Sequence, residues 1–550
     1  SVYNSAGSVR YEHESVISAM GRAAGAALPC LEREVAVDES TRRIRHSDSM
    51  RQAFLSVLLP TFILFLGAPA VGGAQEVTTN ITSSGLGTEV SLELPLDGVY
   101  DITGGTRPGG GPNLFHSFGD FTVGPGDVAN FLNTQVAGSL PLTSNIIGRV
   151  TGGNISNIYG TIQTTGFDVH GVPTNLFLVN PNGIVFGPHG SVDVGGSVSF
   201  STAQYLRLFD GVNSANFYAD PANNNDDLTN SVFAMEPIVD FGFLSPAAYG
   251  FLDVPNPLAT ITVQGSTLSV LPGQSISLVG GNVVIESGTP AGGTAQPAQL
   301  SAPNGRIQLA TAAFPGEFDV NTLQSLPNNP VDPASAVSFT SYGSVFLAAG
   351  SSIDVHGASS TVWIKGGQLV LSVNDATLST SDVSPTPSDT IILSPGSSIM
   401  TSNSAAGPGA DVQITVGNLN LDGSTVTTEN LGDGSGGNIT ANVGTLSLAS
   451  FASLNSNNLG FGIGLGGNLK IQGRTGADSV ADSVMLSNGS SITTQTLSLE
   501  GGSGGDVVIA ARDVLLDGVS SINTFTFGPG RGGNVDITAD FLTLENGSAV

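Results

Sequence analysis

A repeated pair of residues, Gly-Asn or Gly-Asp, limits the fold of this chain more than any other feature of its sequence. A degenerate first copy, Ala410-Asp411, precedes four full copies at 437–438, 467–468, 505–506 and 533–534. The successive pairs are 27, 30, 38 and 28 residues apart. A period of this size is typical of solenoids, in which one small structural unit stacks on the next.

Apolar residues recur at fixed offsets after each pair. After Asn534 they are Val535, Ile537, Ala539, Leu542 and Leu544. The same offsets give alternating apolar residues after Asp506 and after Asn438. The unit that begins at Leu469 resumes only at Val484, fifteen residues on instead of seven, so an insertion of eight residues explains most of its long spacing.

Three short alternating strands per unit predict one turn of a parallel β-helix, in which alternate residues point inward and stack on neighbouring coils. A β-propeller blade would need about 40 residues and four strands. We therefore predict an all-β chain, a right-handed parallel β-helix with a β-rich N-terminal cap and with insertions as outer loops. Five coils would add about 24 Å of length at about 4.8 Å per coil. Val550 falls within a coil, and we expect the sequence to be part of a longer protein.

The composition supports an exported β protein. Hydrophobic residues make up 40% of the chain and charged residues 11%, with 74 glycines. This is enough to bury a core, and it is not a disordered composition. Seven of the 44 acidic residues and seven of the 16 basic ones lie in residues 1–74, which leaves 37 acids against nine bases. Such an excess of acid argues against a nucleic-acid partner.

A secretory signal is predicted near the N-terminus. A basic start at Met50-Arg51 leads into an apolar run of 14 residues from Ala53, too short for a membrane-spanning helix. Small residues precede Ala74, which places cleavage between Ala74 and Gln75. The only cysteine, Cys30, lies ahead of this point, so the mature chain would have no thiol to cross-link in an oxidising compartment. Residues 1–49 are a leader or the product of a wrongly chosen start.

A turn motif stands at Asn180-Pro-Asn-Gly183, between a hydrophobic strand and Ile184. Pro181 fixes φ at about −65°, and Asn182 and Gly183 tolerate positive φ. The motif follows a second hydrophobic segment, Asn113-Leu-Phe-His-Ser-Phe118. Strand-like and glycine-rich segments surround both in a fixed order: 121–123, 146–153, 158–162 and 192–196.

In this order the segments closely resemble the N-terminal secretion domain of two-partner-secretion exoproteins, the filamentous haemagglutinin family. The resemblance is dense over 81–203 and extends to about 318. Residues 136–144 lack the Asn-Pro-Asn-Leu box that some family members carry. The resulting division is a leader (1–49), a signal peptide (50–74), a secretion domain (75–318) and β-helix repeats (319–550).

The resemblance implies a β-helix, and it implies partners in export. The chain would cross the inner membrane through the general secretion machinery, be recognised unfolded by a dedicated outer-membrane β-barrel transporter, and fold outside the cell. The residues that would shape the cap, or be read by the transporter, are Asn113, Leu114, Phe115, Phe118, Asn180, Pro181, Asn182, Gly183 and Ile184. A purely structural role in the turns stays open.

The sequence contains no motif that is typical of a catalytic or metal-binding site. The histidines lack the paired spacing of a zinc site, and His116 is expected to be a packed residue. Two oxygen-rich segments, 220–227 and 432–438, lack the spacing of a calcium loop and are predicted to be solvated. No P-loop or nucleophile elbow is present. We expect no enzymatic activity, no cofactor and no metal.

Three functions remain open for the exported protein. An adhesin-like surface or extracellular β-helix is the leading prediction, with an unidentified extracellular target. A stalk that carries a toxin or enzyme at its C-terminus is the second. A polysaccharide-acting β-helix enzyme is the third, and it would need clustered carboxylates that no spacing marks here.

Overall fold

The computed structural model describes most of the chain after residue 76. The described residues are 77–91, 98–134, 142–167, 171–210, 212, 214–219, 245–252, 259–323, 325–326, 341–348, 350–357, 360–370, 396–404, 406–498 and 500–550. Within them the chain is almost entirely strand, and its one helical element is the short 3-10 turn η1 (Pro108–Gly110). The predicted signal peptide and its cleavage site at Ala74 and Gln75 lie outside the described residues.

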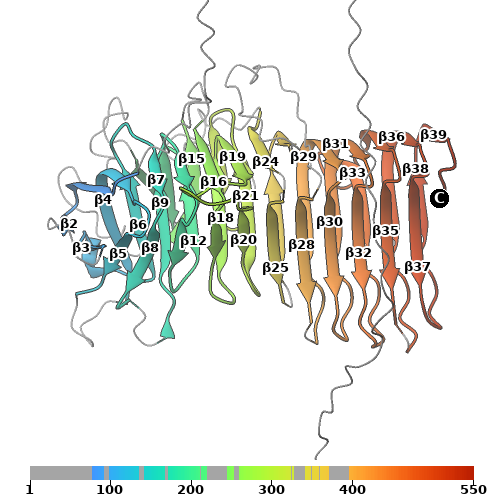
Figure 1. The fold of residues 1–550 in the computed structure, drawn as a ribbon, viewed down its shortest axis with the longest axis horizontal. Helices are drawn as coiled ribbons and strands as arrows, with labels where there is room; N and C mark the ends of the chain where they lie inside the picture. The colour runs from blue at the N-terminus through green and yellow to red at the C-terminus, as the bar shows by residue number, and fades with distance from the viewer. Residues whose placement is uncertain are drawn as a thin grey trace, which may run out of the picture. The chain divides into compact units, whose positions relative to one another are not determined.

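Three rows of parallel strands form the body of the described part of the chain (Figure 1). The first row begins in the cap and runs to the last coil, with each strand paired to the next. Its members are β4 (Asn113–Thr122), β6 (Asn145–Val150), β9 (Asn175–Val179), β12 (Val198–Ser201), β18 (Ser275–Gly280), β21 (Arg306–Thr311), β26 (Thr361–Lys365), β29 (Asp411–Asp422), β31 (Ile439–Ala449), β33 (Leu469–Gly473), β36 (Val507–Leu516) and β38 (Val535–Thr538).

The second row continues each coil after a bend. Its members are β7 (Ser156–Ile158), β10 (Ile184–Phe186), β16 (Thr260–Gln264), β19 (Asn282–Glu286), β24 (Ser344–Leu347), β27 (Gln368–Val370), β34 (Ala481–Leu486) and β39 (Phe541–Leu544). In β29, β31 and β36 the first and second strands of the coil join into one long strand. Two of the three strands expected per coil are therefore continuous in those coils.

The third row closes the coil. It starts with β3 (Val99–Gly104), β5 (Val128–Leu132), β8 (Thr161–Thr165) and β11 (Ser191–Asp193). It goes on through β17 (Thr267–Ser269), β20 (Gln299–Ser301), β25 (Ser352–His356), β28 (Ser398–Asn403), β30 (Thr425–Asn430), β32 (Ser453–Asn458), β35 (Ser491–Thr496) and β37 (Ser521–Thr526). The predicted all-β class and the parallel β-helix are confirmed.

Inward-facing apolar residues stack from coil to coil. The pairing places Ile439 beside Leu469, and Leu446 beside Val484, so the register is kept on both sides of the insertion. All four side chains are buried in one continuous core. Because each coil covers the apolar face of its neighbour, the core is built by stacking rather than by a single collapsed centre.

Antiparallel strands complete the N-terminal region. β1 (Asn80–Gly85) pairs with β4, and β2 (Thr88–Val90) pairs with β3. A separate sheet lies outside the helix and consists of β13 (Tyr205–Phe209), β14 (Ser214–Tyr218), β15 (Ser245–Phe251), β22 (Gly316–Asp319) and β23 (Ser325–Leu326). We call it the outer sheet. No local pattern of residues predicts this sheet, because its strands come from segments about 100 residues apart.

Candidate functional site

The NLFHSF segment forms the first half of β4 and is buried on both faces. Leu114 and Phe118 belong to the core inside the helix. Phe115 points to the other side, where it packs in a second core under the outer sheet, with its ring centroid 5.0 Å from that of Phe217. Asn113 is also buried. A strand with both faces covered cannot show the polar-apolar alternation of a half-exposed strand.

Asn113 begins a ladder of asparagines across three coils. Asn145 Nδ2 donates to Asn113 Oδ1 at 2.8 Å, and Asn175 Nδ2 donates to Asn145 Oδ1 at 3.1 Å. Asn175 Oδ1 then accepts the backbone N–H of Ser197 at 2.9 Å. The three asparagines open β4, β6 and β9 at separations of 32 and 30 residues. This repeat within the cap was missed, although Asn-Leu-Phe, Asn-Ile-Ile and Asn-Leu-Phe could have revealed it.

His116 is a packed residue, as expected. Its ring lies 5.4 Å from that of Phe131 and 6.0 Å from that of Phe118, measured between centroids. Its Nδ1 atom is buried and has no hydrogen-bond partner among the described residues. Burial, followed by the nearby Arg107 cation, lowers the pKa of His116 to about 3. The imidazole is therefore neutral in the folded protein at neutral pH.

The Asn180-Pro-Asn-Gly183 segment is a tight turn that ends β9. The backbone N–H of Gly183 donates to the carbonyl oxygen of Asn180 at 3.1 Å. Asn180 is fully buried, and its Nδ2 donates to Asn154 O at 3.0 Å and to Ser156 Oγ at 2.9 Å. Its Oδ1 accepts the backbone N–H of Asn182 at 3.0 Å. Asn180 thus binds the turn to the coil before it.

The other positions of this turn have separate tasks. Gly183 alone takes a positive φ, of 127°, whereas Asn182, expected to tolerate positive φ, does not adopt it. Ile184 opens β10 and is buried in the helix core. Asn182 is exposed and Pro181 partly exposed. Eight of the nine predicted site residues are therefore at least partly covered in the folded domain.

The two motifs meet through one short segment of the intervening coil. The backbone N–H of Thr151 donates to Phe118 O at 2.8 Å, and Asn182 Nδ2 donates to Gly152 O at 2.7 Å. Asn154, two residues further on, bonds both Asp120 and Asn180. The structure thus brings both predicted motifs to one corner of the helix, on two coils that are separated by the coil of β6.

Charged side chains fasten the outer sheet over β4. Arg149 of β6 donates to Ser117 Oγ at 3.0 Å and to Tyr218 O at 2.8 Å. Within the sheet, Arg207 and Glu317 form an ion pair of 2.8 Å in which Glu317 is only 1% exposed. Tyr205 donates its hydroxyl to the same carboxylate at 2.8 Å. Burial, followed by the Glu317 charge, raises the pKa of Tyr205. These residues were not predicted, since nothing in their spacing marks them.

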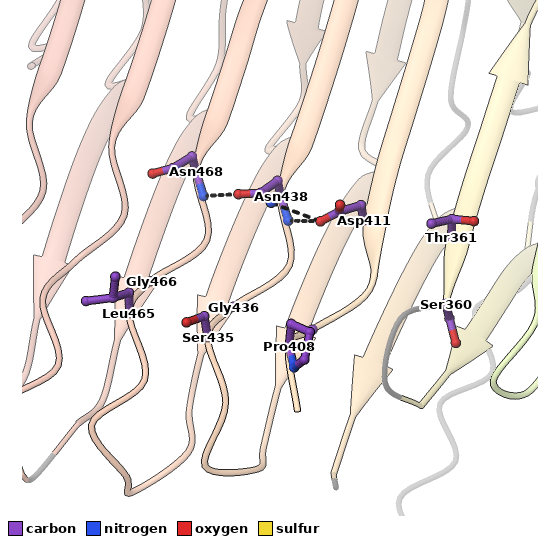
Figure 2. A pocket seen from close by; sticks show the side chains of 11 residues that line it. Ser360, Thr361, Pro408, Asp411, Ser435, Gly436, Asn438, Leu465, Gly466 and Asn468 are labelled. Carbon is purple, nitrogen blue, oxygen red and sulfur yellow. Dashed lines mark hydrogen bonds between the residues drawn. The ribbon is translucent and has the colours of Figure 1, made fainter. Parts of the chain in front are cut away.

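A second ladder explains the Gly-Asn and Gly-Asp pairs of the repeats (Figure 2). Asp411 Oδ1 accepts the backbone N–H of Asn438 at 2.7 Å, and Asn438 Oδ1 accepts that of Asn468 at 2.9 Å. The pattern continues from Asn468 to Asp506 and from Asp506 to Asn534. An open groove of about 510 Å³ runs beside the ladder, past Leu465. It lacks any residue with a shifted pKa among those described here.

The described residues hold no group of three or more His, Cys, Asp and Glu side chains that could bind a metal. The oxygen-rich segment 432–438 forms a stacked corner loop, and the segment 220–227 lies outside the described residues. No helix in the described part of the chain is long and apolar enough to cross a membrane.

Comparisons with known proteins identify a family over part of the chain. Residues 96–362 match the family model described as "TPS secretion domain". A search of curated proteins finds no match. Among solved structures, the crystal structure of the HMW1 secretion domain from Haemophilus influenzae is similar at 14% identity and a TM-score of 0.46, over 86% of this chain and 99% of that one.

Proposed function

We propose that the protein is an adhesin-like β-helix, because residues 96–362 match the TPS secretion domain model and such a domain indicates a secreted exoprotein of the two-partner type. In this proposal a cognate outer-membrane β-barrel transporter exports it, and it acts at the cell surface or outside the cell. The general secretion machinery would deliver it to the periplasm, where residues up to Ala74 would be removed. The predicted division at residue 318 remains part of the proposal, and the family match runs past it.

Burial of the motif residues is the observation that carries the proposed mechanism. Asn113, Leu114, Phe115, Phe118 and Asn180 are each no more than 5% exposed. A transporter cannot contact them in the folded domain, so it would read them only in the unfolded chain. Once outside, the same residues would close the first coils, and each later coil would gain free energy by covering the one before it.

Asn182 is the residue best suited to distinguish recognition by the transporter from a structural role in the turn. It is exposed, and its side chain makes one long-range bond, to Gly152 O at 2.7 Å. The Asn182→Ala variant should therefore fold with a loss of about 1 kcal/mol. Asn304 provides a matched control, because it is an exposed residue of a second Pro-Asn-Gly turn at 303–305.

The test is co-expression of each variant with the transporter, with the exported and retained protein measured beside the thermal stability of the purified chain. Recognition predicts that Asn182→Ala is retained in the periplasm while Asn304→Ala is exported. Normal export of Asn182→Ala would remove its recognition role. Export that does not depend on the transporter would refute the two-partner route itself.

Two other functions are kept as alternatives to adhesion. A stalk for a C-terminal toxin or enzyme would fit the stacked coils equally well, and a compositionally distinct globular region in a full-length sequence would identify it. A polysaccharide-acting enzyme would need paired carboxylates beside an acid or base. Degradation of polysaccharides by the purified protein would favour this last function over adhesion.

A further inference from the structure

The loop between β32 and β33 exposes three apolar side chains at alternate positions. Phe461 is 63% exposed, Ile463 70% and Leu465 55%. They alternate with glycines in the segment 459–468, which carries no charged residue. This is unusual in a chain with a net charge of −28, where most exposed loops could be expected to carry acids.

The alternating glycines explain why these side chains project outward. A Cβ atom at Gly460 would overlap the carbonyl oxygen of Gly432, and one at Gly464 would overlap that of Gly434. The loop therefore lies flat on the corner loop of the preceding coil, with backbone against backbone. The side chains between the glycines have no room on that side and point away from the stack.

The coil before this loop and the second coil after it add to the exposed apolar surface. Leu431 and Phe527 begin the corresponding corner loops, and their backbone N–H groups bond the strand end of the coil before, as that of Leu459 does. Leu431 is 50% exposed and Phe527 55%. We call these five side chains the apolar ridge: Leu431, Phe461, Ile463, Leu465 and Phe527.

The size and shape of the ridge argue against a protein partner. At these exposed fractions each side chain offers on the order of 100 Å², so the ridge offers roughly 500 Å². A specific protein interface buries about 800 Å² on each partner. The ridge also projects from loops, and a second copy of the chain would bring two strongly acidic surfaces together. Apolar side chains on projecting loops can instead insert about 5–10 Å into a lipid headgroup layer, which requires no matching hollow.

We propose that the apolar ridge inserts reversibly into a lipid surface with uncharged or zwitterionic headgroups. Segment 459–468 itself brings no ionised group into the headgroup layer, and the exposed acids Asp433 and Glu500 lie in the two corner loops beside it. The net charge of −28 disfavours approach to an anionic surface. The ridge would thus hold the stacked coils against a neutral membrane surface without a membrane-spanning segment. This inference does not depend on the route of export.

Vesicle flotation of the purified full chain tests the proposal. The chain should float with phosphatidylcholine vesicles, and less with phosphatidylglycerol vesicles at low salt. Replacing Phe461→Ser and Ile463→Ser together should lower the bound fraction at least about tenfold, since both side chains lose their apolar burial. Val519→Ser is the control, because Val519 is 71% exposed and lies at the opposite end of β37 from Phe527.

Each outcome decides the matter. Failure of the chain to float, or equal flotation of the double variant, would overturn the proposal. So would a dimer in sedimentation that the double variant abolishes while flotation is unchanged, because the ridge would then bind a second copy. Equal thermal unfolding of all variants would show that the ridge has no role in folding, as its exposure predicts.

Discussion

Acidification should destabilise the cap through His116, which is buried without a partner for Nδ1 among the described residues. Its pKa is about 3 in the folded protein, against 6.5 for an unperturbed histidine, because of desolvation first and the Arg107 cation second. The unfolded chain therefore binds a proton that the folded cap excludes. The contribution of His116 to the free energy of unfolding is fully present above pH 6.5, and it falls progressively as the pH drops toward 3.

The size of the effect follows from the two pKa values. Between pH 7 and pH 4.5 the cap should lose about 2.5 kcal/mol of stability from His116 alone, or roughly seventyfold in its opening equilibrium. The measurement is amide hydrogen exchange of β4 at both pH values, corrected for the intrinsic exchange rate. Other groups titrate over the same pH range, so the loss of protection in β4 is compared with that in the His116→Leu variant. Leucine replaces the imidazole with an apolar side chain of similar size that cannot bind a proton.

The control for this comparison is His356→Leu, since the His356 side chain is 50% exposed and should contribute no such difference to β4. His116→Leu should be as stable as the natural chain at pH 7, because replacing an unpartnered buried polar group by an apolar one is close to neutral. An equal loss of protection on acidification in the natural chain and in His116→Leu would refute the reasoning.

Three other substitutions test the packing of the cap, each by urea denaturation monitored at the N-terminal strands. Asn180→Ala should cost about 2–3 kcal/mol, because buried partners lose their bonds, and an unchanged midpoint would contradict the role of Asn180. Gly183→Ala should cost about 1–2 kcal/mol for its positive φ, whereas Gly153→Ala, with open space around it, should change little. Glu317→Ala should cost about 3–5 kcal/mol by leaving Arg207 without its carboxylate, and replacing both residues by apolar ones should recover much of the loss.

The repeats were the most predictable part of the fold, because local chemistry and long-range pairing agree there. An Asp or Asn such as Asp411 or Asn438 recurs at the same position of each coil, since its side-chain oxygen accepts a backbone N–H of the next coil. The apolar offsets recur because the same inward positions stack. The sequence also located the insertion correctly between β33 and β34. Periodicity of this kind survives in the sequence because each coil contacts only its neighbours.

The cap was predictable in part. The turn at Asn180–Gly183 followed from its residues, but the partners of Asn180 lie in another coil, at Asn154 and Ser156, and no local pattern points to them. The outward burial of Phe115 could not be foreseen, because the outer sheet that covers it comes from distant segments. Resemblance to a family identified the motif residues, while their burial emerged only from the structure.

The insertion of eight residues between β33 and β34 has a consequence for how such a protein can change over time. The strands before and after it keep their pairing with β31, so extra residues at this bend alter neither the core nor the stacking of later coils. A chain of this kind can therefore gain or lose residues at this bend without refolding its core. An engineer could graft a foreign peptide there.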